Sequence, residues 1–369
     1  MNTASFLLIS LTNSIRPILP ISLIHFIHPI SPVMNKSSFR IIFMGTPDFA
    51  VASLKALVEN QYNVVAVVTM PDKPMGRHGS VLQPSAVKQY AVSVGLPVLQ
   101  PEKLKDEAFL EKLRSYQADL QIVVAFRMLP EVVWNMPPHG TFNLHASLLP
   151  QYRGAAPINW AIINGEKETG VTTFFLQQEI DTGAIIHQER LSIGPEDNAE
   201  VVHDSLMAMG AALVLRTIDD ILADNVHPIS QDEYVAKDAV SLKPAPLMPA
   251  PKLFRDNTRI DWQQSAAAIH DFIRGLSPYP SAWTTLVSPD GTESALKLFE
   301  SRVVVSSPVT SDEFVLYPGE IDTDGKTYIN IGTRAGILSV LSLQLAGKKR
   351  MPVADFLRGH AQLNQCMVV

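Results

Sequence analysis

Hydrophobic and polar positions follow two alternating patterns from residue 40 onward. Short, nearly continuous apolar runs, such as RIIFM at 40–44 and NVVAVVT at 63–69, are separated by stretches with helical periodicity, such as FAVASLKALVEN at 49–60. Buried strands that alternate with helices predict a parallel sheet with helices on both faces. We therefore expect a doubly wound α/β domain, which ends with a long helix from about residue 198 to about residue 225.

The pattern changes at 241-SLKPAPLMPAPKLFRDN-257, where four prolines interrupt any regular periodicity. This composition predicts a linker, which we assign to residues 241–256. One amphipathic segment, DWQQSAAAIHDFIRGL, follows the linker, and short apolar runs typical of β-strands come after it. Many short strands in so small a segment favour a β-barrel. The predicted domains are therefore residues 34–240 and residues 257–369.

Residues 1–33 are apolar, but four prolines and Arg16 interrupt them. Prolines break helices, and the uninterrupted apolar runs are shorter than the ~20 residues that span a bilayer. The segment also lacks the charged start and small-residue cleavage site of a signal peptide. We expect Met34 to be the working start and residues 1–33 to be a non-core N-terminal extension. An unusual targeting segment is the alternative.

Composition narrows the class of protein. The 369 residues carry a formal net charge of −6, and 46% of them are hydrophobic, which indicates a soluble globular protein. The acidic balance excludes a globally basic nucleic-acid binder but not a local basic channel. Because Cys366 is the single cysteine, the chain can form neither an internal disulfide nor a cysteine-based zinc site. We therefore expect a cytoplasmic protein with no metal site and no membrane association.

The stretch 143-NLHASLLPQYRG-154 places polar side chains at the end of a predicted strand. Residues i and i+2 of a strand point to the same face, so Asn143 and His145 can enter one pocket. In an open α/β sheet, ligands bind outside the carboxyl ends of the strands, where this stretch begins its loop. The turn GTPDF after the first strand lacks the G-x-G-x-x-G fingerprint, and the chain has no P-loop motif. Dinucleotide and ATP binding are therefore not expected.

Asp181, in 179-EIDTGAII-186, begins a turn after another predicted strand. An amide, an imidazole and a carboxylate together suit acyl transfer: the amide stabilises an oxyanion, the imidazole takes a proton, and the carboxylate fixes its tautomer. No serine or cysteine nucleophile is needed if the amine of the substrate attacks. Taken singly, Asn143 could be a turn residue, His145 a buried structural histidine and Asp181 a cap. Their joint placement favours a catalytic site.

Seven segments carry a resemblance to a known family: 44-MGTPDFA-50, 69-TMPDKPMGR-77, 143-NLHASLLPQYRGAAPINWAI-162, 170-GVTTFF-175, 181-DTG-183, 258-TRIDW-262 and 342-SLQLAGKKRM-351. Together they are similar to the methionyl-tRNA formyltransferases, from about Arg40 to about Leu357. The N-x-H, SLLPxxRG and DTG elements occur in other enzymes that use 10-formyltetrahydrofolate, and so identify only the superfamily. The loop after the second strand and the C-terminal module narrow the choice.

The resemblance implies a Rossmann-like formyltransferase domain joined to an OB-like C-terminal β-barrel that binds tRNA. It implies transfer of the formyl group of 10-formyltetrahydrofolate to the α-amino group of methionyl initiator tRNA, by a monomer. The catalytic residues of the family match Asn143, His145 and Asp181. Its folate-binding turn matches Ser147, Leu148, Leu149 and Pro150. Whether His145 acts as a base or electrostatically is left open by the sequence.

The tRNA contacts implied by the resemblance fall in two regions. The loop 70-MPDKPMGRHGSVLQP-84 provides Lys73 and Arg77, and the C-terminal module provides Lys348, Lys349 and Arg350. The HGSVLQ part of the loop carries fewer positive charges than is common in the family, so Arg77 is expected to be the main contact. A second departure is Arg127, where many relatives carry glycine. The sequence leaves open whether it lies at the rim of the folate pocket or points to solvent.

Other functions remain open at this point. The chain could formylate a nucleotide sugar or glycinamide ribonucleotide, or hydrolyse formyltetrahydrofolate with water in place of the amine. A noncatalytic protein that binds folate or RNA is an alternative from another class. The set formed by Asn143, His145 and Asp181 argues against that alternative.

Overall fold

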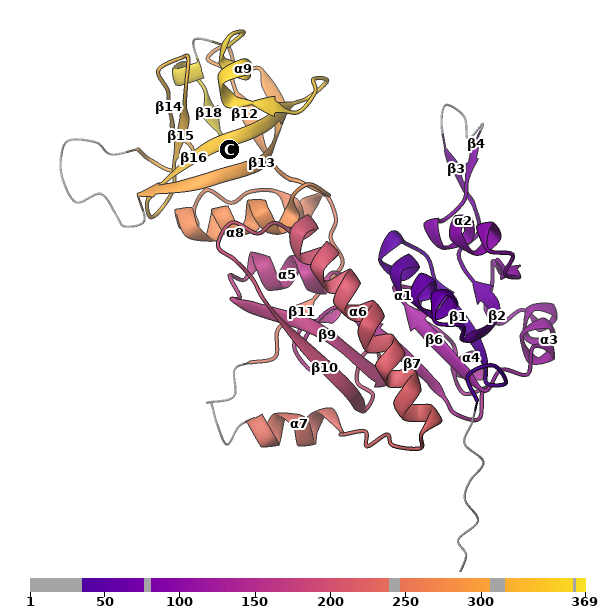
Figure 1. Ribbon diagram of the computed structural model, residues 1–369. Coiled ribbons are helices and arrows are strands. Elements are labelled where there is room, and N and C mark those ends of the chain that lie inside the picture. Colours follow the sequence, from indigo (N-terminus) through magenta and orange to yellow (C-terminus); the bar gives the residue numbers. More distant parts are fainter. Residues whose placement is uncertain (1–34, 76–80, 239–245, 306–315, 361–362) are drawn as a thin grey trace, which may run out of the picture. The chain divides into compact units, whose positions relative to one another are not determined.

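A computed structural model describes residues 35–75, 81–238, 246–305, 316–360 and 363–369 of the chain. The predicted extension at residues 1–33 and the first part of the predicted linker, residues 241–245, lie outside the described residues. Seven of the strands between residues 40 and 192 form one sheet, and the seven strands between residues 282 and 368 form a second (Figure 1). The two predicted regions of regular structure therefore each build a sheet.

The N-terminal sheet has the strand order β10-β9-β7-β6-β1-β2-β5. Its strands are β1 Arg40–Gly45, β2 Asn63–Val68, β5 Val98–Leu99, β6 Leu120–Val124, β7 Thr141–His145, β9 Glu168–Phe175 and β10 Ile185–Ser192. The strands from β7 to β5 are parallel, as predicted, but β9 pairs antiparallel with β7, and β10 with β9. The predicted parallel sheet is thus extended at this edge by two antiparallel strands, β9 and β10. For β9 and β10, the connection over residues 176–184 is too short for the crossover of a dozen or more residues that parallel pairing needs.

Helices cover both faces of this sheet, because alternate residues of each central strand enter different cores. In β1, Ile41 and Phe43 belong to the core under one face, and Ile42 and Met44 to the core under the other. The helices of this part are α1 Asp48–Glu59, α2 Ala86–Ser93, α3 Glu107–Ser115, α4 Glu131–Trp134, α5 Pro157–Ile163, α6 Ala199–Leu222 and α7 Gln231–Asp238. The prediction of a Rossmann-like α/β domain is confirmed.

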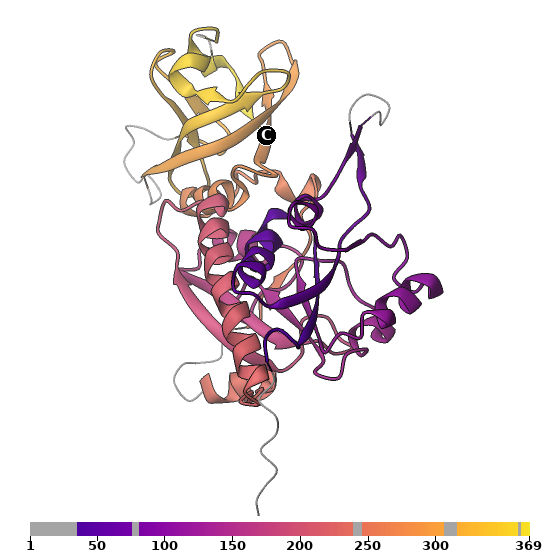
Figure 2. The same cartoon turned by 45° about the vertical axis from the view of Figure 1, so that its right-hand side comes forward.

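Helix α6 is the long helix expected over about residues 198–225. The Asn198 side chain caps it by accepting a hydrogen bond from Val201 N at 3.0 Å. By length and composition alone it could cross a membrane, and it is the one described helix that meets this test. Val202, Leu206 and Val214 on this helix are nevertheless buried in the core that it shares with α1 and the sheet. Figure 2 shows the α6 ribbon beside that of α1. Its apolar character is explained by this packing.

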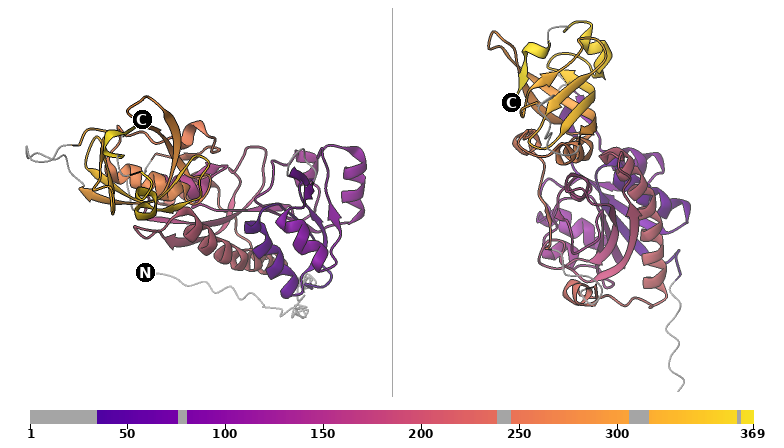
Figure 3. Two further views of the ribbon diagram at one scale, coloured as in Figure 1. Left: turned by 90° about the horizontal axis from the view of Figure 1, so that it is seen from above. Right: turned by 90° about the vertical axis from the view of Figure 1, so that its left-hand side faces the viewer.

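The C-terminal sheet curls into a nearly closed antiparallel barrel (Figure 3). Its strands are β12 Ala282–Val287, β13 Glu293–Val305, β14 Ile321–Asp322, β15 Ile329–Gly332, β16 Ile337–Leu345, β17 Met351–Pro352 and β18 Met367–Val368. The two end strands approach each other, since Val368 N donates to Gly319 O at 2.9 Å. The helices α8 Ala266–Leu276 and α9 Val353–Leu357 and the 3-10 turns Asp256–Thr258 and Leu363–Gln365 accompany it. The predicted β-barrel is confirmed.

The second part of the predicted linker holds the N-x-H loop in place. Strand β11, Pro249–Ala250, pairs in parallel with β8, Arg153–Gly154. Trp160 Nε1 donates to Pro251 O at 2.7 Å. This segment therefore supports the backbone that carries the predicted site.

Candidate active site

Three predicted catalytic residues meet in one cavity at the carboxyl end of β7. Asn143 and His145 lie on this strand, and Asp181 lies in the connection from β9 to β10. All three line a cavity of about 780 Å³. Parallel strands open their carboxyl ends at one edge of the sheet, which is where the α/β fold places ligands. The sequence prediction that Asn143 and His145 share one face agrees with this position.

The His145 ring is held by a backbone carbonyl. His145 is buried, its Nε2 lies 2.9 Å from Tyr152 O, and its ring meets the buried Phe174 ring edge-on. A carbonyl oxygen only accepts, so Nε2 carries the hydrogen and Nδ1 of the neutral ring keeps its lone pair. Tyr152 has a left-handed backbone with φ 60°, and its hydroxyl donates to Glu166 Oε1 at 2.6 Å. Both features fix the direction of the carbonyl.

Asp181 lies close to His145 without forming a hydrogen bond to it. The Asp181 Oδ2 atom is 3.9 Å from His145 Nδ1, and the two side chains are 14% and 8% exposed. The same oxygen accepts a hydrogen bond from Gly154 N at 3.0 Å. The sequence suggested that the carboxylate fixes the tautomer of the imidazole, but Tyr152 O does so. The contact between Asp181 and His145 is therefore electrostatic and not a hydrogen bond.

The Asn143 amide is free to bind a ligand. Its side chain is half-buried and lines the cavity, and it has no hydrogen-bond partner among the described residues. A buried or half-buried amide normally finds a partner, because an unpaired one loses its hydration without compensation. Asn143 is thus positioned as a hydrogen-bond donor or acceptor for a bound molecule.

The turn that resembles a folate-binding turn lies outside the cavity wall. Ser147, Leu149 and Pro150 are buried, and Leu148 is half-buried. The Ser147 hydroxyl donates to Gln151 O at 2.6 Å, and Leu149 N donates to Thr172 Oγ1 at 3.2 Å. These two hydrogen bonds fix the turn internally and against β9. Their direct contact with folate stays a prediction.

Other residues form most of the cavity wall, and sequence reasoning did not single them out. They come from the segments that follow β6 and β9, and include Phe126, Leu129, Trp134, Leu176 and Gln177. Apolar and aromatic walls with a few polar groups are typical of a small-molecule site. The one available signal was their position after the carboxyl ends of predicted strands.

Arg127 also lines this cavity. The sequence left open whether Arg127 lies at the rim of a pocket or points to solvent, and the structure places it at the cavity. Its Nη1 donates to Glu102 O at 2.8 Å, and its Nη2 donates to Pro101 O. The guanidinium also lies over the Phe126 ring, 5.6 Å from the centroid. Arg127 therefore connects the segment after β6 to the segment after β5.

The predicted tRNA-binding residues do not line the cavity. Lys73 is exposed on the hairpin of β3, Lys73–Met75, and β4, Val81–Gln83, while Arg77 lies outside the described residues. Lys348 and Lys349 are exposed in the turn after β16. The Arg350 guanidinium pairs with Glu300, and its Nε donates to Ser342 Oγ at 2.9 Å. Lys348 and Lys349 are therefore more available to bind a partner than Arg350 is.

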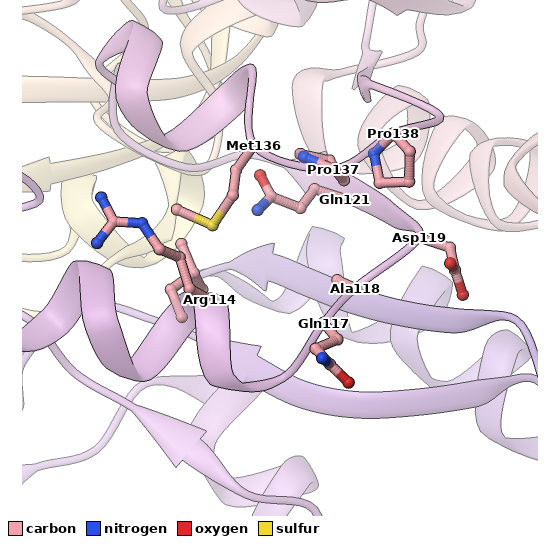
Figure 4. Close-up of a pocket in the computed structure, with 9 residues that line it drawn as sticks. Arg114, Gln117, Ala118, Asp119, Gln121, Met136, Pro137 and Pro138 are labelled. Carbon is pink, nitrogen blue, oxygen red and sulfur yellow. The ribbon is translucent and has the colours of Figure 1, made fainter.

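A second, smaller hollow of about 370 Å³ lies at the amino ends of the parallel strands (Figure 4). Arg114, Asp119, Gln121 and Met136 are part of its wall, and none of the predicted site residues is. In the described part of the chain, no group of three or more histidines, cysteines, aspartates and glutamates could hold a metal ion. The three predicted catalytic residues thus line the 780 Å³ cavity and not the smaller hollow.

Comparisons with known proteins agree with this geometry. The family model described as Formyl transferase matches residues 39–218, and that described as Formyl transferase, C-terminal domain, matches residues 252–361. The methionyl-tRNA formyltransferase of Parabacteroides distasonis is 63% identical over 335 residues, which cover 91% of this chain and 100% of the relative. That of Bacteroides thetaiotaomicron is 59% identical over 326 residues, covering 88% and 97%.

Solved structures show the same fold at low identity. HypX from Aquifex aeolicus in complex with tetrahydrofolic acid has a TM-score of 0.56 and 19% identity, covering 88% of this chain and 47% of that one. The chain thus spans about half the length of HypX. WlaRD, a sugar 3N-formyl transferase, has a TM-score of 0.54 and 18% identity, covering 84% and 99%.

Proposed function

This chain belongs to the methionyl-tRNA formyltransferase family, and we propose that it transfers the formyl group of 10-formyltetrahydrofolate to the α-amino group of methionyl initiator tRNA. The observation that carries the proposal is the meeting of Asn143, His145 and Asp181 in one cavity. Formyl transfer to an amine needs an oxyanion donor and a proton acceptor, and no protein nucleophile. These three side chains supply those two functions.

Each residue has a role that follows from its contacts. The unpartnered Asn143 amide donates to the formyl oxygen, on which negative charge develops when the amine attacks. His145 takes the proton of the amine at Nδ1, since Nε2 is already bonded to Tyr152 O. The bond between the formyl carbon and N10 of the folate then breaks, and N10 takes up a proton as tetrahydrofolate leaves. Asp181, 3.9 Å from that nitrogen, stabilises the imidazolium by its charge. Tyr152 and Gly154 hold the two partners in this arrangement.

The cavity suits a folate cosubstrate. Its volume of about 780 Å³ is in the range of pockets that bury most of a drug-sized ligand. Phe126 and Trp134 offer aromatic surface for a flat heterocycle, and the free Asn143 amide marks the reacting end. The buried turn from Ser147 to Pro150 supports this end, and its contact with folate is part of the proposal.

Methionyl-tRNA is bound by basic residues outside the cavity. RNA is held mainly through its phosphates and its unpaired end, so exposed lysines and arginines carry most of the affinity. We assign this role to Lys73 and Arg77 of the loop after β2, and to Lys348, Lys349 and Arg350 of the barrel. Arg77→Ala is expected to weaken formylation of methionyl-tRNA and to leave folate binding unchanged.

The proposed setting is the cytoplasm, with the chain acting as a monomer and away from membranes. The acidic net charge of −6 and the single cysteine support a soluble enzyme of a reducing compartment. No metal takes part in the proposed reaction, because the charge of the transition state is balanced by Asn143 and His145.

A formylation assay tests the proposal. Purified protein is given 10-formyltetrahydrofolate with methionyl-tRNA, free methionine or an amino-sugar nucleotide as the acceptor. We expect formylation of methionyl-tRNA alone, and a loss of ~100-fold or more in turnover for His145→Ala. Formylation of the sugar nucleotide, or formate release without transfer, would contradict the proposal.

A further inference from the structure

Arg127 brings a positive charge into the cavity wall without a carboxylate to balance it. Its side chain is half-buried, and two of its nitrogen atoms donate to the backbone carbonyls of Pro101 and Glu102. None of the described aspartates and glutamates forms an ion pair with it. Glu179 and Asp181 are the carboxylates that line the same cavity, and both belong to the connection after β9.

The guanidinium also keeps an unused donor. The Nε atom of Arg127 is buried and has no hydrogen-bond partner among the described residues. Nη1 and Nη2 each use one hydrogen for a backbone carbonyl and keep a second one, so this edge of the planar guanidinium can still bind an anion with two oxygens. Burial lowers the pKa of Arg127, because the charged form loses hydration that the two carbonyls replace only in part. An anionic ligand would stabilise the charged guanidinium in place of the lost hydration.

Building on the proposed function, we propose that Arg127 binds a carboxylate of the glutamate tail of the formyl-folate cosubstrate and thereby selects for this tail. The tail is joined to N10 through the p-aminobenzoyl group, so it must lie to one side of Asn143 and His145. Arg127 follows β6, whose Val124 is the register partner of Leu144 in β7. One ligand can therefore reach both the catalytic strand and the guanidinium within the same cavity.

A phosphate of the tRNA acceptor end is the competing anion. Phosphates of RNA are bound mainly by exposed basic side chains, as Lys348 and Lys349 are. Arg127 is instead half-buried, fixed to two backbone carbonyls, and part of the wall of the cavity in which the folate cosubstrate is proposed to bind. The geometry favours the carboxylate.

Calorimetric binding to two ligands tests the proposal without any acceptor. One ligand is 5-formyltetrahydrofolate, and the other is its diamide, in which both glutamate carboxylates are neutral. We expect Arg127→Met to weaken binding of the acid by ~10- to 100-fold, the range for a charged hydrogen-bonded group. Binding of the diamide is expected to be equal for the wild type and Arg127→Met. The matched control is Arg114→Met, which removes an exposed arginine that pairs with Glu107 at 3.1 Å, and it leaves both affinities unchanged.

The diamide separates ligand recognition from the support that Arg127 gives to the loop of Pro101 and Glu102. An equal loss for acid and diamide would show that Arg127 only holds the loops, and would overturn the proposal. Unchanged binding of both ligands, or a change confined to the KM for methionyl-tRNA, would also overturn it. If Arg127→Met lowers the unfolding temperature so far that binding cannot be measured, Arg127→Lys takes its place. Lysine keeps the charge without the fork, so acid binding should fall ~3- to 10-fold with no change for the diamide.

The two proposals fail in different experiments. A wild type that binds the acid through Arg127 but does not formylate methionyl-tRNA would overturn the proposed function alone. If the wild type formylates methionyl-tRNA, but the ratio of acid affinity to diamide affinity is the same in the wild type and in Arg127→Met, the role of Arg127 alone is overturned.

Discussion

Replacing Asp181 by asparagine removes one charge from the site and little else. Asp181 has a left-handed backbone with φ 55°, a conformation that asparagine tolerates well. The amide oxygen of asparagine can still accept the hydrogen bond from Gly154 N. Asp181→Asn therefore isolates the electrostatic effect of the carboxylate on His145.

The size of this effect follows from the distance of 3.9 Å between Asp181 Oδ2 and His145 Nδ1. Two unit charges at that separation attract by about 1 kcal/mol with the dielectric constant of water, and by about 4 kcal/mol with an effective value of about 20. The side chains are 14% and 8% exposed, so the higher value sets the upper limit. If the imidazolium forms in the transition state, Asp181→Asn should slow formyl transfer by ~5- to 1000-fold.

Single-turnover formylation of methionyl-tRNA with saturating formyl-folate measures this step. A matched control is Asp220→Asn, because Asp220 Oδ2 lies 2.8 Å from His187 Nε2 in a pair that does not line the cavity. The control variant should keep the wild-type rate, and Asp181→Asn should keep the wild-type unfolding temperature. A wild-type rate in a folded Asp181→Asn protein would refute the electrostatic role.

Three further variants test separate parts of the site. Gly154→Ala places a Cβ 2.4 Å from Ala250 O at a φ of +130°; it should cost ~1–3 kcal/mol in the free energy of unfolding and slow transfer, and an unchanged denaturation midpoint would disprove the close packing. Asn143→Ala should cut turnover by ~100-fold or more with an unaltered melting temperature, whereas near-normal turnover would remove the amide from the mechanism. Alanine at both Lys348 and Lys349 should raise the KM for methionyl-tRNA and lower its salt dependence by roughly one unit of log–log slope per lost phosphate contact; identical salt curves would exclude these lysines from RNA binding.

Local sequence patterns predicted the main strands and helices and the shared face of Asn143 and His145. The apolar runs and helical stretches predicted the central strands, α6 and the change to a barrel after the proline-rich segment. The i, i+2 spacing of Asn143 and His145 placed both side chains on one face, because alternation along a strand depends on neighbouring residues alone. These features need no knowledge of distant contacts.

Only the tertiary structure decided how the site is completed. Asp181 reaches His145 because β9 pairs antiparallel with β7, and this pairing depends on long-range contacts that no local pattern contains. Tyr152 orients the imidazole through its carbonyl group, and Arg127 is likewise held by two carbonyls of a distant loop. Every residue carries a carbonyl, so no residue type marks these partners in the sequence, and the packing of the whole domain decides which of them reaches the site.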